Sequence, residues 1–186
     1  VPGVHNDTIS FAYNDGVSGQ SVDRDITGTG VTPASLSITE SDPYNFGTIA
    51  VGATNSHVFT ITNGGGFTAS SMVEVGLGLP FRFVGGSYPG TGGNCGGTLA
   101  PAANCTIDVE YAPTGTGLAT DTISMSYDNG AAVVTSDRDI QGTGAAAALI
   151  TITETDPYDY GSITVGATGT HTCLLYTSPS PRDPSI

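Results

Sequence analysis

The sequence predicts an all-β protein with an immunoglobulin-like β-sandwich, and three observations lead to this prediction. Apolar and polar residues alternate strictly in several short segments, which is the period of a half-buried strand. Turn sequences rich in glycine and asparagine separate these segments. Similar segments also return after about the length of one sandwich domain.

The alternating segments predict antiparallel strands with one buried face. Ile107, Val109 and Tyr111 fall on one face of such a segment, and polar residues such as Asp108 fall on the other. The segment 121–127 alternates in the same way. We expect seven or eight short strands in the complete repeat unit and no helix.

Turn chemistry marks where these strands end. The sequences Asn-Asp-Gly at 14–16 and Asp-Asn-Gly at 128–130 are typical of hairpin turns, because Asn and Gly tolerate positive φ angles. The glycine-rich stretches 63–66 and 85–97 are expected to be loops.

An internal repeat defines the domain organisation. Position 7 corresponds to position 121, and the shift stays the same without a gap along the repeat. The segments DTISFAYNDG, DRDITGTG and SITESDPYNFGTIAVGAT at 7–16, 23–30 and 37–54 return as DTISMSYDNG, DRDIQGTG and TITETDPYDYGSITVGAT at 121–130, 137–144 and 151–168. The repeat is too long for a solenoid unit and fits a whole sandwich domain.

The repeat predicts one complete unit and two partial ones. Residues 35–144 form the complete Ig-like unit. Residues 1–30 correspond to the last strands of a preceding unit, and residues 147–172 correspond to the first strands of a following unit. The repeat pattern stops at about residue 172. The string CLLYTSPSPRD that follows resembles the translation of a sequencing adapter, so 173–186 is expected to be a non-native tail, with a natural Pro/Ser-rich linker as the alternative.

Charge and hydropathy exclude two classes of partner. The chain has 17 acidic and four basic side chains, with a formal net charge of −13. A protein that binds the phosphate backbone of nucleic acid needs a basic surface, which this composition does not provide. No apolar run approaches the roughly 18 residues that span a bilayer, so no membrane insertion is expected in this fragment.

Three ordered motifs carry a resemblance to a known family. They are FGTIAVGATNSHVFTITNGG at 46–65, CGGTLAPAANCTIDVEYAPTGTG at 95–117 and DIQGTG at 139–144. The sequence resembles the Ig-like repeats of bacterial choice-of-anchor D proteins, which are similar to ASH/Hydin-type domains. The resemblance implies tandem sandwiches on secreted or surface-attached bacterial proteins, whereas the eukaryotic relatives imply cytoplasmic scaffolding of cilia or centrosomes.

Two cysteines lie in the complete unit. Cys173 lies at the start of the adapter-like string and is set aside. Cys95 and Cys105 form either a disulfide or two buried free thiols, and the family resemblance favours the disulfide, which implies an oxidising compartment. No CxxC motif or nearby histidine adds the further ligands that a metal site needs.

Paired aspartates are the strongest lead for ion binding. Asp23 and Asp25, like Asp137 and Asp139, flank an arginine, so both carboxylates of a pair share one strand face. Calcium prefers such oxygen ligands, which makes these residues weak calcium candidates. The favoured interpretation is a solvated acidic strand, because no EF-hand loop is present.

No catalytic motif is found, so we expect no enzymatic activity and no cofactor. The sequence GGSYPG at 85–90 departs from the nucleophile motif G-x-S-x-G, and no phosphate-binding glycine loop is present. His57 and His171 are equivalent positions of the repeat, so they indicate one structural position and not a cluster. His5 lies far from both in the sequence.

These features predict a structural and interaction module. We expect a spacer or stalk of tandem Ig-like domains in an extracellular or cell-surface bacterial protein, with the neighbouring repeats of the same chain as its partners. An adhesin that binds a protein or a glycan is the first alternative, with Tyr88 in the loop 85–97 as the recognition residue. That loop is otherwise expected to be a flexible connector, held only by Cys95. A ciliary or centrosomal ASH-type scaffold is the second alternative.

Overall fold

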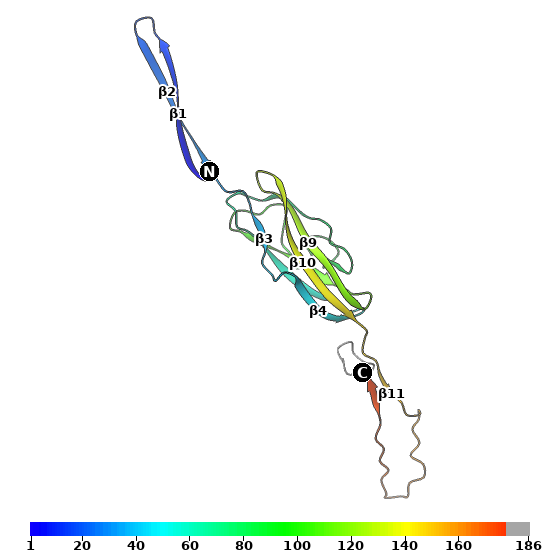
Figure 1. Ribbon diagram of the computed structural model, residues 1–186. Coiled ribbons are helices and arrows are strands. Elements are labelled where there is room, and N and C mark those ends of the chain that lie inside the picture. Colours follow the sequence, from blue (N-terminus) through cyan, green and yellow to red (C-terminus); the bar gives the residue numbers. More distant parts are fainter. Residues whose placement is uncertain (178–186) are drawn as a thin grey trace.

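The computed structural model describes residues 1–177, and this part of the chain contains strands and no helix. Figure 1 shows a central sandwich with a hairpin beyond one end and a short strand pair beyond the other. The strands are β1 (Gly3–Asn14), β2 (Gly19–Gly30), β3 (Leu36–Ile38), β4 (Tyr44–Ala50), β5 (Asn55–Asn63), β6 (Ser70–Glu74), β7 (Phe81–Phe83), β8 (Asn104–Tyr111), β9 (Gly117–Asp128), β10 (Val133–Ala145), β11 (Ile150–Ile152) and β12 (Leu175–Thr177).

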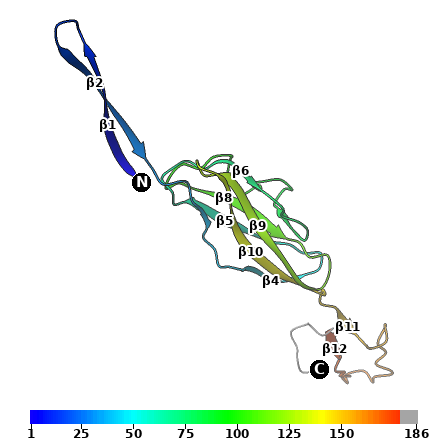
Figure 2. The ribbon, with the colours of Figure 1, turned by 45° about the horizontal axis from the view of Figure 1, so that its top comes forward.

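The sandwich consists of two four-stranded sheets, which Figure 2 shows as two packed layers. One sheet has the order β3-β5-β8-β7 and the other has the order β4-β10-β9-β6. All pairs are antiparallel except β4 with β10, which run parallel. The prediction of an all-β, Ig-like sandwich with seven or eight strands is confirmed, because β3 to β10 are eight strands.

The alternation of apolar and polar residues in the sequence corresponds to an alternation of buried and more exposed residues in the structure. Ile107, Val109 and Tyr111 of β8 are 1% exposed or less, and they face the opposite sheet. Asp108 differs from the expectation, because it is also buried although it points to the outer face of β8. The loop between β7 and β8 covers this outer face, so alternation alone did not predict the burial of Asp108.

Aromatic rings fill the centre between the two sheets. Phe81 and Tyr111 stack with ring centroids 4.9 Å apart, and Phe46 lies 6.2 Å from Phe59 by the same measure. Each such side chain stabilises the fold by about 1.5–3 kcal/mol through removal from water. The core therefore depends on contacts between strands that are distant in the sequence.

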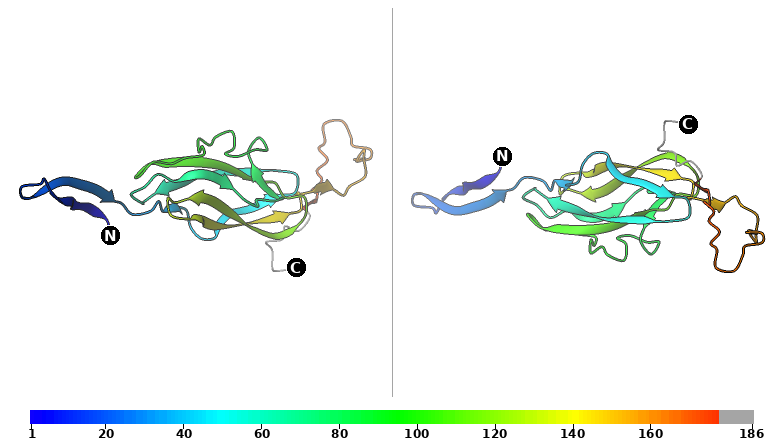
Figure 3. Two further views of the ribbon diagram at one scale, coloured as in Figure 1. Left: turned by 90° about the horizontal axis from the view of Figure 1, so that it is seen from above. Right: turned by 90° about the horizontal axis from the view of Figure 1, so that it is seen from below.

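The partial repeats form separate sheets. β1 and β2 pair along their whole length, from Gly3 opposite Gly30 to Asn14 opposite Gly19. Figure 3 shows this hairpin beyond one end of the sandwich, and β11 with β12 beyond the other. The tail expected at 173–186 lies outside the described residues from residue 178 onward. No helix within the described part of the chain is long and apolar enough to cross a membrane.

Candidate functional site

The cysteine pair anchors the long loop of residues 84–103 to β8. Cys95 and Cys105 form a disulfide with their Cα atoms 4.9 Å apart, and both residues are buried. The expected disulfide is therefore present, and the alternative of two free thiols in this unit is wrong. Cys173 is free and exposed.

Backbone hydrogen bonds attach the same loop along much of its length. The Asp108 N–H donates to the Pro89 carbonyl at 2.8 Å, and the Asn94 N–H donates to the Thr106 carbonyl at 2.9 Å. A side chain at Gly90 would collide with the Asp108 backbone, so this glycine permits the close approach. The expectation of a connector held only by Cys95 is wrong, because backbone hydrogen bonds also hold the loop against β8 as a layer.

Tyr88 is a packing residue of this layer. Its ring is half-buried and meets the ring of Phe83 edge-on, with centroids 5.6 Å apart. Its hydroxyl donates to the Gly96 carbonyl at 3.4 Å. Burial raises the pKa of the Tyr88 phenol, and the charge of Glu74 adds to this shift. Much of the Tyr88 side chain, which was predicted to be the recognition residue, therefore packs against the rest of the protein.

The aspartates Asp137 and Asp139 lie on the outer face of β10, as their spacing predicts. The Ser124 hydroxyl donates to Asp137 at 2.6 Å, and the Thr122 hydroxyl donates to Asp139 at 2.7 Å. The arginine between them, Arg138, lies on the inner face. It donates to the Ile38 carbonyl and its Nη1 lies 3.3 Å from the Asp42 carboxylate.

The hairpin repeats the aspartate arrangement on a separate sheet. Asp25 accepts a hydrogen bond from the Thr8 hydroxyl at 2.7 Å, and Asp23 accepts one from Ser10. The two aspartate pairs belong to different sheets, β1-β2 and β4-β10-β9-β6, so the repeat does not unite them in one sheet. Each carboxylate already accepts a hydrogen bond from a hydroxyl group of the neighbouring strand.

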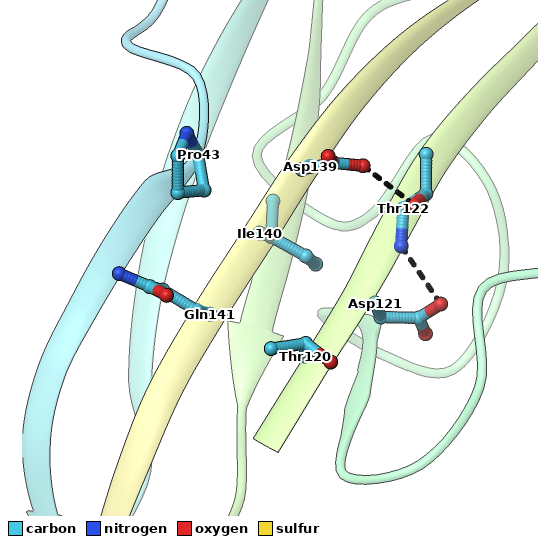
Figure 4. Close-up of a pocket in the computed structure, with 7 residues that line it drawn as sticks. All are labelled: Pro43, Thr120, Asp121, Thr122, Asp139, Ile140 and Gln141. Carbon is cyan, nitrogen blue, oxygen red and sulfur yellow. Dashed lines mark hydrogen bonds between the residues drawn. The ribbon is translucent and has the colours of Figure 1, made fainter. Parts of the chain in front are cut away.

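A shallow depression of about 400 Å³ lies beside Asp139, and Figure 4 shows the residues that line it. Asp121 accepts hydrogen bonds from the Thr122 N–H at 2.8 Å and the Gly78 N–H at 2.9 Å. The lining residues are Pro43, Thr120, Asp121, Thr122, Asp139, Ile140 and Gln141. This set contains no histidine, cysteine or cation, so it offers carboxylates as acceptors but no nucleophile or general base of the histidine type.

The histidines of the repeat occupy one structural position, as expected. His57 stacks on Tyr44 with centroids 4.2 Å apart, and its Nε2 lies 3.9 Å from the Glu40 carboxylate. The equivalent His171 stacks on Tyr158 with centroids 4.0 Å apart. The third histidine, His5, contacts the Val1 carbonyl in the hairpin at 2.8 Å, far along the chain from both.

Sequence reasoning missed one cluster of possible metal ligands. Glu154 and His171 of the C-terminal partial unit and Cys173 at the start of the expected tail place their ligand atoms within 4.8 Å of one another. The repeat would have found the first two, since Glu40 and His57 are their equivalents. The third has no equivalent ligand in the complete unit, because Phe59 stands at that position and is part of the core.

Comparisons with known proteins agree with this fold. A family model described as the HYDIN/CFA65/VesB-like Ig-like domain matches residues 36–143. A comparison with curated protein sequences finds no match.

Among solved structures, the Vibrio cholerae VesB protease is similar at 16% identity and a TM-score of 0.46, over 60% of this chain and 32% of that chain. A Porphyromonas gingivalis W83 protein of unknown function is similar at 12% identity and a TM-score of 0.45, over 77% and 66%. The ASH/PapD-like domain 7 of human CEP192 is similar at 14% identity and a TM-score of 0.44, over 63% and 88%.

This chain thus spans about a third of the VesB protease structure that it matches. The family model covers more than half of this chain, and it covers the residues that form the sandwich. The protein therefore belongs to the HYDIN/CFA65/VesB-like family of Ig-like domains.

Proposed function

We propose that this chain is a non-catalytic structural and interaction module, one link in a series of Ig-like units. The polypeptide enters the sandwich at one end and leaves it at the opposite end (Figure 3), and this observation carries the proposal. At the entry, the Ala34 N–H donates to the Asn129 carbonyl at 3.0 Å. At the exit, the Val51 N–H donates to the Ala145 carbonyl at 2.8 Å. The length of β10 separates the two points, so units joined in this way extend in a line.

The connections on both sides are short. Residues 31–35 join β2 to β3, and residues 146–149 join β10 to β11. Linkers of this length allow little change in spacing between neighbouring units. The formal net charge of −13 opposes association between such chains and keeps them soluble.

Small-angle X-ray scattering tests the end-to-end arrangement. We compare the chain with a variant that carries one additional copy of residues 31–144 after Gly144. The maximum dimension is expected to increase by roughly 40 Å, the length of thirteen extended residues. An unchanged maximum dimension would mean that the units fold back on each other, and it would contradict a spacer.

We further propose an extracellular or cell-surface location, on a protein of the choice-of-anchor D type. The buried disulfide supports this proposal, because such bonds persist in oxidising compartments. Thiol titration of unfolded protein that was never reduced is expected to detect Cys173 alone. Detection of all three cysteines would favour the cytoplasmic ASH-type scaffold instead.

A binding role through Tyr88 is the weaker proposal. The packing of Tyr88 against Phe83 leaves less of the ring for a ligand. We expect neither the wild type nor Tyr88→Ala to bind a glycan array. Binding by the wild type that is lost in the variant would support an adhesin over a spacer.

A further inference from the structure

We propose that one face of the β1–β2 hairpin is a docking surface for the open sheet of another Ig-like unit that lacks its own last two strands. The hairpin face is defined by Ile9, Phe11, Tyr13, Ile26 and Gly28. The proposal rests on the proposed series of units. It goes further by naming the contact residues and the chemistry of the partner.

The hairpin face is exposed although its counterparts are buried. Ile9, Phe11, Tyr13 and Ile26 are 58%, 67%, 49% and 46% exposed, whereas the residues at the equivalent positions of the complete unit, Ile123, Met125, Tyr127 and Ile140, are 0%, 0%, 5% and 1% exposed. The two hairpins also share their register, since Ser10 lies opposite Asp23 as Ser124 lies opposite Asp137. The hairpin face therefore has the pattern of a core surface that has no cover within the described residues.

Gly28 indicates an aromatic ring in the partner. Its counterpart Gly142 is crossed by Tyr111, whose ring would lie 2.6 Å from a Cβ atom at that position. Nothing lies within 4 Å of such an atom at Gly28. The described part of this chain gives no steric reason for glycine at position 28, and a partner sheet of the β3-β5-β8-β7 type supplies one.

Two polar side chains specify further contacts. The Tyr127 hydroxyl accepts a hydrogen bond from the Leu36 N–H at 3.0 Å, so Tyr13 is placed to accept one from a partner backbone. Arg24 is exposed on the same face as Ile9, which lies opposite it in the hairpin. Its counterpart Arg138 reaches the Ile38 carbonyl of the opposite layer and the Asp42 carboxylate between β3 and β4, and Arg24 requires the same two groups from the partner.

The edges of the hairpin complete the description of the partner. In the sandwich, β10 pairs with β4 in parallel and β9 pairs with β6 in antiparallel orientation. β1 and β2 pair only with each other in the described chain, which leaves two long backbone edges open. The sandwich of a second copy does not fit, because its own β9 and β10 already occupy the matching place. The partner is therefore an Ig-like unit whose last two strands are missing.

Hydrogen exchange tests this proposal on an extended chain. Residues 31–114 are copied in front of Val1, so that a complete set of partner strands precedes the hairpin in the natural repeat register. The backbone amides of β1 and β2 are expected to exchange at least about 100-fold more slowly than in the unextended chain, because core strands exchange only through costly opening. Gly28→Val in the extended chain is expected to abolish this protection, while Thr27→Val on the opposite face retains it.

A control shows that the added strands accept a hairpin. It is the extended chain with residues 115–144 in place of residues 1–30, since that hairpin is known to fit. Protection of the control but not of the native hairpin overturns the proposal, as does protection that survives Gly28→Val. Protection of the hairpin in the unextended chain together with a dimer mass by light scattering overturns it in favour of a second copy. The scattering test of the proposed function does not use the hairpin face, so either idea can fail alone.

Discussion

At the scale of single residues, Asn63 is a buried polar side chain that connects separate segments of the sandwich. It is fully buried, and its Oδ1 accepts hydrogen bonds from the N–H groups of Ser35 and Gly65 at 3.1 and 3.0 Å. Its Nδ2 donates to the carbonyls of Phe67 and Leu99 at 2.9 and 3.0 Å. One side chain thus joins three backbone segments, and each of its polar atoms has the hydrogen-bond partners that a buried polar group requires.

Replacement of Asn63 should be far more costly than its size suggests. Asn63→Ala removes four hydrogen bonds between a buried side chain and the backbone, each of which contributes about 0.5–1.5 kcal/mol, so we expect a loss of about 3 kcal/mol or more in the free energy of unfolding. Urea denaturation measures the loss. Asn94→Ala is the matched control, because Asn94 also accepts bonds from Thr106 but is exposed, so water replaces them. Equal effects of the two substitutions would contradict the assigned role.

Glu74 makes the stability depend on pH. Burial raises the pKa of its carboxyl, the Leu77 N–H opposes this shift at 2.9 Å, and the charge of Asp121 adds to it. The folded protein therefore holds the Glu74 proton more tightly than the unfolded chain does. This contribution to stability is complete below the ordinary carboxyl pKa, and it is lost as the pH rises through the raised value.

Glu74→Gln should consequently be more favourable at neutral than at acidic pH. The amide oxygen can still accept the Leu77 bond, and no buried charge forms when the pH rises. We expect the free energy of unfolding of the variant, relative to the wild type, to increase from about pH 4 to pH 7, measured by denaturation at each pH. Asp156→Asn, a substitution at an exposed position, controls for the change in net charge. A relative stability that falls over this range would contradict the assignment.

The sequence predicts some core residues and not others. Tyr111 and Ile123 were placed correctly in the core, because the alternation of apolar and polar residues decides which face they take. Asn63 precedes three glycines and has the sequence signature of a loop. Its four partners come from segments up to 36 positions away, so its role exists only after folding.

At the scale of the elements, the loop 84–103 is the clearest departure from expectation. Glycine content predicted flexibility, yet glycine here allows the backbone to approach β8 closely. The Asp108 N–H donates to Pro89 on the outer face, and the disulfide from Cys95 to Cys105 fixes the same layer. This added layer explains why Asp108 is buried on the predicted polar face of β8.

The disulfide is expected to stabilise the loop without being essential to it. Replacement of Cys95 and Cys105 together by alanine should lower the free energy of unfolding by about 3 kcal/mol, from the added freedom of the unfolded chain. The circular dichroism spectrum should remain that of the wild type, because the backbone bonds to β8 remain. Cys173→Ala should leave stability unchanged, since Cys173 is exposed. A double variant as stable as the wild type would show that the disulfide does not contribute to the free energy of unfolding.

At the scale of the whole molecule, the paired aspartates are predicted to be a surface feature and not an ion site. Asp137 and Asp139 already accept hydrogen bonds from hydroxyl groups of β9. We therefore expect millimolar calcium to leave the thermal unfolding midpoint at the value found with magnesium at equal ionic strength. Differential scanning calorimetry measures both midpoints. A rise specific to calcium would restore these residues as calcium ligands.

The sequence by itself determined the β class, the repeat and the faces of the main strands, and it left Cys95 and Cys105 as either a disulfide or two free thiols. These properties are local or periodic, so the pattern of neighbouring residues is enough to predict them. Only the tertiary structure decided that a glycine-rich loop covers β8, that Asn63 joins three segments and that no segment within residues 1–177 covers the face around Phe11. Those properties depend on which distant segments come into contact, and such contacts leave no pattern among neighbouring residues of the sequence.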